Sequence, residues 1–196
     1  MEPLFLGGHP AVDFLNTALQ PDGEHIETIG DGRAFVAWLV AAGLIDAGQG
    51  TKLLRRLGAK DADVAAADAR KLREWAREWL ERWRVAPNAN YAQEIKSLNA
   101  YLSQESVSRE VVATKEGWSL QTHAHLEDSD AVLALLAATI ASLVTEEDPS
   151  LVRACAGPAC TLWFLDRTKA HRRLFCSAAT CGNRAKVAAF RERQRE

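Results

Sequence analysis

Apolar positions recur with a helical period through the first hundred residues of the chain. Pro10 suits the first turn of a first helix, in which apolar side chains of residues 11–18 share one face. A second helix is expected to begin at the N-cap Asp31 and to end at Gly43. Further helices are expected over residues 47–57, 61–84 and 89–102.

The period changes to two after residue 106. Residues 107–114 and 118–126 predict an antiparallel hairpin around the turn Lys115-Glu116-Gly117. Residues 131–144 then form a helix that is apolar almost all round. Fourteen residues are too few to span a bilayer, so we expect a buried central helix and no transmembrane segment. The pattern predicts an α+β, mostly helical N-terminal domain with a small antiparallel sheet.

Aromatic residues form a stripe on the longest predicted helix. The stripe consists of Leu72, Trp75, Trp79, Leu80 and Trp83. Aromatic residues at i, i+4 and i+8 most often pack against neighbouring helices, so we interpret the stripe as core. A face that stacks on a ligand is the alternative.

Four cysteines near the C-terminus carry the clearest chemistry in the chain. Cys155, Cys160, Cys176 and Cys181 follow the spacing C-x4-C, fifteen residues, C-x4-C, and the chain contains no other cysteine. Thiolates are soft ligands, and four of them surround Zn²⁺ tetrahedrally. We therefore predict a structural zinc site, closed to catalysis because four thiolates leave no open position. Disulfides and inert core cysteines are the alternatives.

The residues between the cysteine pairs predict a small treble-clef-like finger. Trp163-Phe164-Leu165 and Arg173-Leu174-Phe175 are interpreted as the strands of a hairpin, with 167–172 as its turn. Ser177 is a plausible N-cap for a helix that carries the last ligand. About 45 residues hold too little core to fold alone, and zinc would supply the missing stability.

The start of the chain has neither a basic segment nor a long apolar run, so we predict no signal peptide and a cytoplasmic location. Disulfides would require an oxidising compartment, which makes them the weaker alternative.

The segment that begins at the last cysteine resembles a known signature. Cys181-Gly182-Asn183-Arg184-Ala185-Lys186 is similar to the signature of the CGNR zinc-finger family, and residues 151–155, 163–166 and 172–173 extend the likeness. In that family the finger follows an N-terminal domain called ABATE, whose opening resembles residues 7–17. The resemblance implies an ABATE-like domain over residues 1–148, a CGNR finger over residues 149–196, and a stress-induced transcription regulator.

Charge is distributed unequally along the chain. The net charge is −2, yet the segment from residue 151 to the end holds ten Lys or Arg and three Asp or Glu, a balance of +7. The preceding residues therefore carry −9. An acidic body with a basic end indicates a polyanionic partner, and a solvated helix end is the alternative.

Two functions fit this pattern. In the first, the finger binds DNA through basic and polar side chains, of which Asn183 or Arg184 would contact a base edge. The expected contacts are Arg172, Arg173, Asn183, Arg184, Lys186 and Arg191. The N-terminal domain would then sense a small-molecule effector or mediate homodimerisation. In the second, the finger is a protein-docking module anchored by Trp163, Phe164 and Phe175.

Other candidate sites are weaker. His9, Asp13 and Asn16 share a helix face and form either a small ligand pocket or a hydrogen-bonding network around the Gly7-Gly8 turn. His123 and His125 could hold a metal only with a third partner. No nucleophile motif, phosphate loop or HExxH helix is present, so we expect no enzyme.

Overall fold

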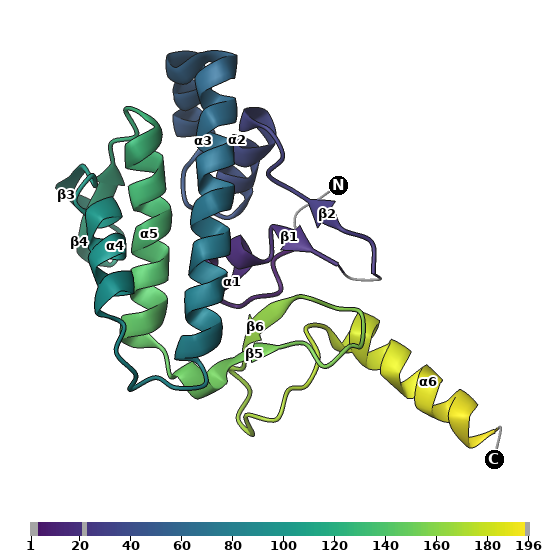
Figure 1. The fold of residues 1–196 in the computed structure, drawn as a ribbon. Coiled ribbons are helices and arrows are strands. Elements are labelled where there is room, and N and C mark those ends of the chain that lie inside the picture. Colours follow the sequence, from purple (N-terminus) through teal and green to yellow (C-terminus); the bar gives the residue numbers. More distant parts are fainter. Residues whose placement is uncertain (1–3, 21–22, 195–196) are drawn as a thin grey trace. The chain divides into compact units, whose positions relative to one another are not determined.

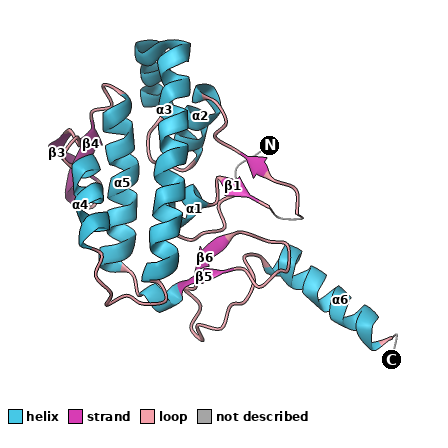
Figure 2. Ribbon diagram, in the orientation of Figure 1, coloured by secondary structure: helices cyan, strands magenta, loops and turns pink. Residues whose placement is uncertain are grey.

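The computed structural model describes residues 4–20 and 23–194 and has the predicted fold class. Helices account for 53% of it, and every sheet is a pair of antiparallel strands (Figure 2). The first three residues of the expected N-terminal domain and the last two residues of the basic C-terminal segment lie outside the described residues.

The chain divides into two compact units. Unit 1 combines Met1–Ile29, Arg73–Ala89 and Ser142–Glu196, and unit 2 combines Gly30–Leu72 and Asn90–Ala141. The segment of the four cysteines therefore belongs to the same unit as the N-terminal residues. The domain boundary expected between residues 148 and 149 lies inside the segment Ser142–Glu196, which belongs entirely to unit 1.

Unit 2 contains the helices α2 (Gly32–Ala41) and α4 (Ala92–Leu102) and the strands β3 (Val107–Thr114) and β4 (Gly117–Ala124), which pair over their full length (Figure 1). These elements confirm the predicted second helix, fifth helix and hairpin. Asp31 caps α2 by accepting a hydrogen bond from the Ala34 N–H at 2.8 Å.

The two helices predicted over residues 47–57 and 61–84 are halves of α3 (Ala47–Trp83). Gly58 has φ 70° and ψ 173°, a left-handed φ that few residues other than glycine adopt, and it kinks the helix. Of the aromatic stripe, Trp79 and Trp83 are 2% and 6% exposed, as expected for core residues.

The apolar helix α5 spans Ser129–Glu146 and is longer than predicted. Its 18 residues have a mean hydropathy of 1.5, so by length and composition it could cross a membrane. Contrary to the prediction, the helix is therefore long enough to cross a bilayer. Val132, Leu136 and Ile140 are nevertheless fully buried, which agrees with the interpretation of α5 as a core helix.

Unit 1 begins with the short helix α1 (Pro10–Leu15) and the strands β1 (Ala18–Leu19) and β2 (Ile26–Glu27). Arg73, on the last part of α3, is 3% exposed and fastens these elements. Its guanidinium donates to both carboxylate oxygens of Glu27 at 2.9 and 2.7 Å and to Thr17 Oγ1 at 2.9 Å. Such a bidentate, charge-assisted pair fixes the geometry of a buried arginine.

The C-terminal part of unit 1 consists of a 3-10 turn (Pro149–Leu151), the strands β5 (Val152–Ala154) and β6 (Trp163–Leu165), one turn of π-helix (Ala178–Gly182) and α6 (Asn183–Arg193). The predicted pairing of residues 163–165 with 173–175 is wrong, because β6 pairs with β5 and residues 173–175 form no strand.

Asp166 explains why the segment after β6 forms a loop. Its carboxylate is fully buried and accepts hydrogen bonds from Thr168 N at 3.1 Å, Thr168 Oγ1 at 2.6 Å and Arg173 N at 2.9 Å. Burial raises the pKa of Asp166, but these hydrogen bonds and the nearby charge of Arg153 hold it below its usual range. The backbone that a hairpin would use is thus bound to one carboxylate.

Candidate metal centre and nucleic-acid interface

The four cysteines converge on one point of unit 1. Their Sγ atoms all lie within 4.8 Å of one another; Cys176 Sγ is 3.6 Å from Cys181 Sγ and 3.8 Å from Cys160 Sγ. All four cysteines are free in the structure, and both separations exceed the S–S bond of a disulfide, which is about 2.05 Å. A tetrahedral zinc site with Zn–S bonds of about 2.3 Å separates its sulfurs by about 3.8 Å, so the donor set fits Zn²⁺.

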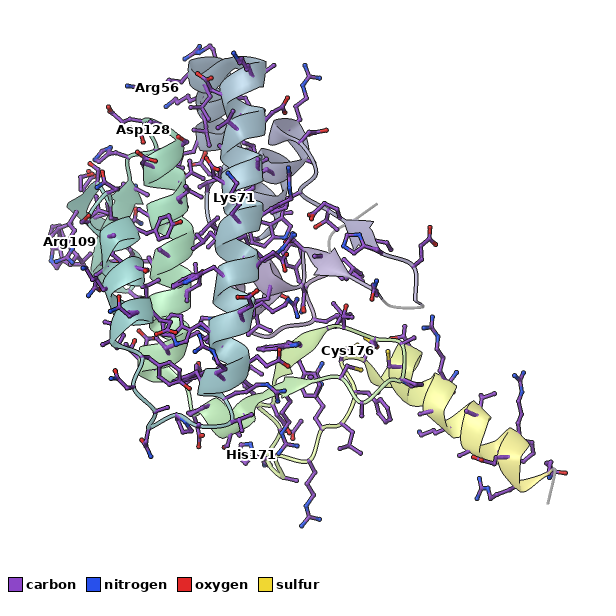
Figure 3. The ribbon with its side chains drawn as sticks, in the orientation of Figure 1. Arg56, Lys71, Arg109, Asp128, His171 and Cys176 are labelled. Carbon is purple, nitrogen blue, oxygen red and sulfur yellow. The ribbon has the colours of Figure 1, made fainter. Side chains whose placement is uncertain are left out.

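Local turns bring the cysteines together. Cys155 follows β5, and Gly157 lets the chain fold back: a Cβ at Gly157 would lie 3.2 Å from Cys160 Cβ and 3.4 Å from Cys181 Sγ. Cys176 precedes Ser177, whose hydroxyl accepts from Thr180 N at 3.3 Å and caps the π-turn that contains Cys181. The predicted N-cap is therefore confirmed. Cys176 and its sulfur lie at the base of α6 (Figure 3).

Backbone N–H groups favour the thiolate of Cys155. Gly157 N and Cys176 N approach its Sγ at 3.4 and 3.3 Å. Burial opposes ionisation of Cys155, but these donors hold its pKa below the usual range. Burial also raises the pKa of Cys176 and, with the neighbouring Cys155 thiolate, raises that of Cys160 to about 11. A divalent cation reverses this effect, because metal ligation deprotonates thiols.

The cysteines belong to an apolar cluster that includes the N-terminal segment. Leu162 and Phe164 of the finger pack with Leu19 of β1, and Leu6 and Ile26 pack against the same cluster. The core around the candidate metal centre is thus built partly by residues from the start of the chain.

Three polar residues on α1 and at its two ends, His9, Asp13 and Asn16, make their hydrogen bonds inside the protein. His9 caps α1, as its Nδ1 accepts from Ala11 N at 3.2 Å. Asp13 Oδ1 accepts from Gly7 N at 2.7 Å, and Asn16 pairs with the backbone of Trp163. Burial raises the pKa of Asp13 to about 6, although backbone donors at Gly7 and Leu6 lower it. These hydrogen bonds agree with the predicted network around the Gly7-Gly8 turn. The alternative, a small ligand pocket, stays a prediction.

Within the described residues, no third metal-ligating side chain joins His123 and His125 in a metal site. His123 Nε2 lies 3.7 Å from Glu110 Oε2, an exposed contact within the β3–β4 hairpin. Among residues 4–20 and 23–194, the structure brings three or more metal-ligating side chains together at one place, the four cysteines.

Five of the six side chains predicted to bind DNA are exposed. These are Arg172 on the loop after β6 and Asn183, Arg184, Lys186 and Arg191 on α6. Arg173 instead makes its contacts inside the finger. Its guanidinium donates to the carbonyls of Phe175, at 2.9 Å, and of Cys176, and its Cζ lies 4.2 Å from the centroid of the Phe164 ring. Its position indicates a structural role within the finger.

An α+β domain and a metal-binding four-cysteine finger, joined in one chain, define the class of this protein. The chain belongs to the ABATE family, described as "Putative stress-induced transcription regulator", whose family model matches residues 8–147. Residues 152–194 match the CGNR zinc finger. Both assignments confirm the resemblance found in the sequence, in the same order. No curated protein is significantly similar to the chain.

Proposed function

We propose that this protein is a transcription regulator that binds DNA through its C-terminal finger. Zn²⁺, held by Cys155, Cys160, Cys176 and Cys181, has a structural role, and the protein catalyses no reaction. The N-terminal domain senses an effector or joins two copies of the chain. Because the site needs reduced thiols, we place the protein in the cytoplasm.

The main support for DNA binding is the exposed, basic surface of α6. None of its residues is buried, and the helix extends from the finger as a single element (Figure 1). It carries Arg184, Lys186, Arg191 and Arg193 and one acidic residue, Glu192. A helix that presents four cations and buries none of its own residues is suited to the phosphates of a nucleic acid.

The zinc site holds the N-terminal end of α6 in place. Cys181 lies in the turn that leads directly into Asn183, so metal ligation fixes the start of α6. Arg172 adds an exposed cation from the loop between the cysteine pairs. The metal supplies only structure, because four thiolates leave no position for a reacting group.

Binding of the full-length, zinc-loaded chain to duplex DNA across a salt series tests the proposal. Affinity should fall steeply with salt, and Arg191→Gln should weaken binding to all sequences and lower the slope by about one unit. Arg109→Gln, which removes an exposed arginine from β3, is the matched control and should change neither. If the wild type retains zinc and binds no DNA at low salt, the proposal fails.

The alternative is a docking module for another protein. A groove of about 570 Å³ beside α6 contains Leu174, 59% exposed, and Phe175. Trp163 and Phe164, predicted as partner anchors, are 4% and 0% exposed and belong to the core, so such a partner would contact Leu174 and Phe175 instead. Binding to an apolar interface would respond little to salt.

A further inference from the structure

The outward side of α6 carries a ridge of residues suited to reading bases. Asn183, Val187, Phe190 and Gln194 are spaced four, three and four residues apart, which places them on one face of the helix. Val187 and Phe190 are 41% and 57% exposed. We call these four residues the ridge.

A row of cations runs along each side of the ridge. Arg184 and Arg191 are seven residues apart and follow one side, whereas Lys186 and Arg193 have the same spacing and follow the other. All four residues are exposed. The ridge is therefore bounded by positive charge on both sides.

The opposite face of α6 carries Ala185, Ala188 and Ala189, followed by Glu192, and its alanines face the finger. Ala185 and Ala188 line a cavity of about 250 Å³ together with Cys160 and Cys181. Ala185 also lines the groove beside Leu174, together with Ala189. Because the alanine face is turned toward the finger, the ridge is turned away from it.

A helix of this kind needs a partner. Isolated helices shorter than about 12–15 residues are marginal in water, and α6 has 11 residues, none buried. Exposed Val187 and Phe190 add apolar surface that the described part of the chain does not cover. The partner must therefore offer negative charge on two sides and an apolar or base-edge surface between them.

We propose that α6 is a recognition helix that enters the major groove of duplex DNA, an inference that rests on the DNA-binding function proposed above. A helix with its side chains is about 10–12 Å wide and the major groove about 12 Å. The two cation rows contact the phosphates of the two strands. Val187 and Phe190 contact the C5-methyl groups of thymine, and Asn183 hydrogen-bonds adenine, so the preferred site contains A·T pairs.

The favoured partner follows from the charge arrangement. A protein groove for Val187 and Phe190 would have to place acidic side chains along both sides of the ridge. Duplex DNA presents two phosphate backbones on either side of its major groove as a consequence of its structure.

The test begins with selection of a preferred site from random duplexes by the full-length, zinc-loaded protein. Each thymine of that site is then replaced by uracil, which removes only the C5-methyl group. At the one or two thymines that Val187 and Phe190 contact, the wild type should lose about fourfold in affinity, as expected for one buried methyl group. The double variant Val187→Ser/Phe190→Ser removes both apolar side chains, and with zinc content and salt slope unchanged it should bind thymine and uracil duplexes about equally. Ala188→Ser, on the opposite face, should behave as the wild type.

The outcomes separate the two levels of the proposal. If the wild type binds DNA with no site preference, or if the double variant loses as much affinity on uracil substitution as the wild type, the recognition helix is wrong but DNA binding stands. If the zinc-loaded wild type binds no duplex at low salt, DNA binding itself is wrong, and the ridge is left to a protein partner.

Discussion

The side-chain amide of Asn16 is paired with the backbone of Trp163 as a neighbouring strand would be. Asn16 Nδ2 donates to the Trp163 carbonyl and Asn16 Oδ1 accepts from Trp163 N, both at 2.9 Å, across 147 residues of sequence. Leu165 N donates to the Gly7 carbonyl at 2.7 Å. The N-terminal segment therefore supplies hydrogen-bond partners to the backbone of β6 along the edge that does not pair with β5. Residues from the start of the chain thus form part of the finger's structure.

Replacement of Asn16 by Ala should destabilise the protein by roughly 2–4 kcal/mol. It removes two buried hydrogen bonds and leaves both backbone groups of Trp163 without a partner. Urea unfolding of the full-length chain measures the change. The exposed Asn99→Ala on α4 is the control and should lie within about 0.5 kcal/mol of the wild type. An Asn16→Ala protein as stable as this control would show that the pairing contributes nothing.

Removal of the metal should loosen the N-terminal segment as well as the finger. Leu19 and Leu6 pack in the same cluster as the cysteines, so Cys176→Ser or a chelator should expose both. Hydrogen exchange should accelerate at Leu19 and Phe164 and stay slow at Leu136 in unit 2, which is fully buried. If exchange accelerates only from residue 152 onward, the finger is independent of the N-terminal segment.

The regular helices and the cysteine site could be predicted because each has a repeating or spaced signal. A helical period revealed α2 and α4, and two C-x4-C pairs predicted four thiols around one point. The strands β1, β2 and β5 have two or three residues each, too few to show any period.

Tertiary partners account for what the sequence could not reveal. Residues 173–175 have strand-like composition, but the buried carboxylate of Asp166 binds the Arg173 N–H and holds this backbone in a loop. The role of Asn16 depends on Trp163, and no local pattern relates positions so far apart. The only available signal was that Asn16 lies in the stretch that resembles the opening of the ABATE domain.

Ionisation of Asp13 should lower the stability of the protein as the pH rises. Burial raises the pKa of this carboxyl to about 6 in the folded state, above its ordinary value of 3.8, so the folded state holds a proton that the unfolded chain has released. The stabilising contribution is complete below pH 3.8 and is lost as the pH rises through about 6. Asp13→Asn keeps an oxygen that can accept from Gly7 N. It should therefore be at least as stable as the wild type at pH 8.

Urea unfolding at pH 4.5 and at pH 8 measures this effect. The unfolding free energy of Asp13→Asn minus that of the wild type should be larger at pH 8 than at pH 4.5, because only the wild type loses stability as Asp13 ionises. A difference that does not change with pH would show that Asp13 is ionised in both states throughout this range.

Arg172 and Arg173 are neighbours with different surroundings, and their variants should separate DNA contact from finger stability. Arg173 donates to the carbonyls of Phe175 and Cys176, so Arg173→Gln should destabilise the protein by roughly 1–3 kcal/mol and promote zinc loss. Arg172 is exposed, so Arg172→Gln should leave stability within about 0.5 kcal/mol and lower the salt slope of DNA binding by about one unit. Urea unfolding, zinc content and DNA titrations at several salt concentrations, carried out on both variants, test this assignment. An Arg173→Gln protein that keeps its zinc and stability but loses a unit of salt slope would place Arg173 on the phosphates and reverse the two roles.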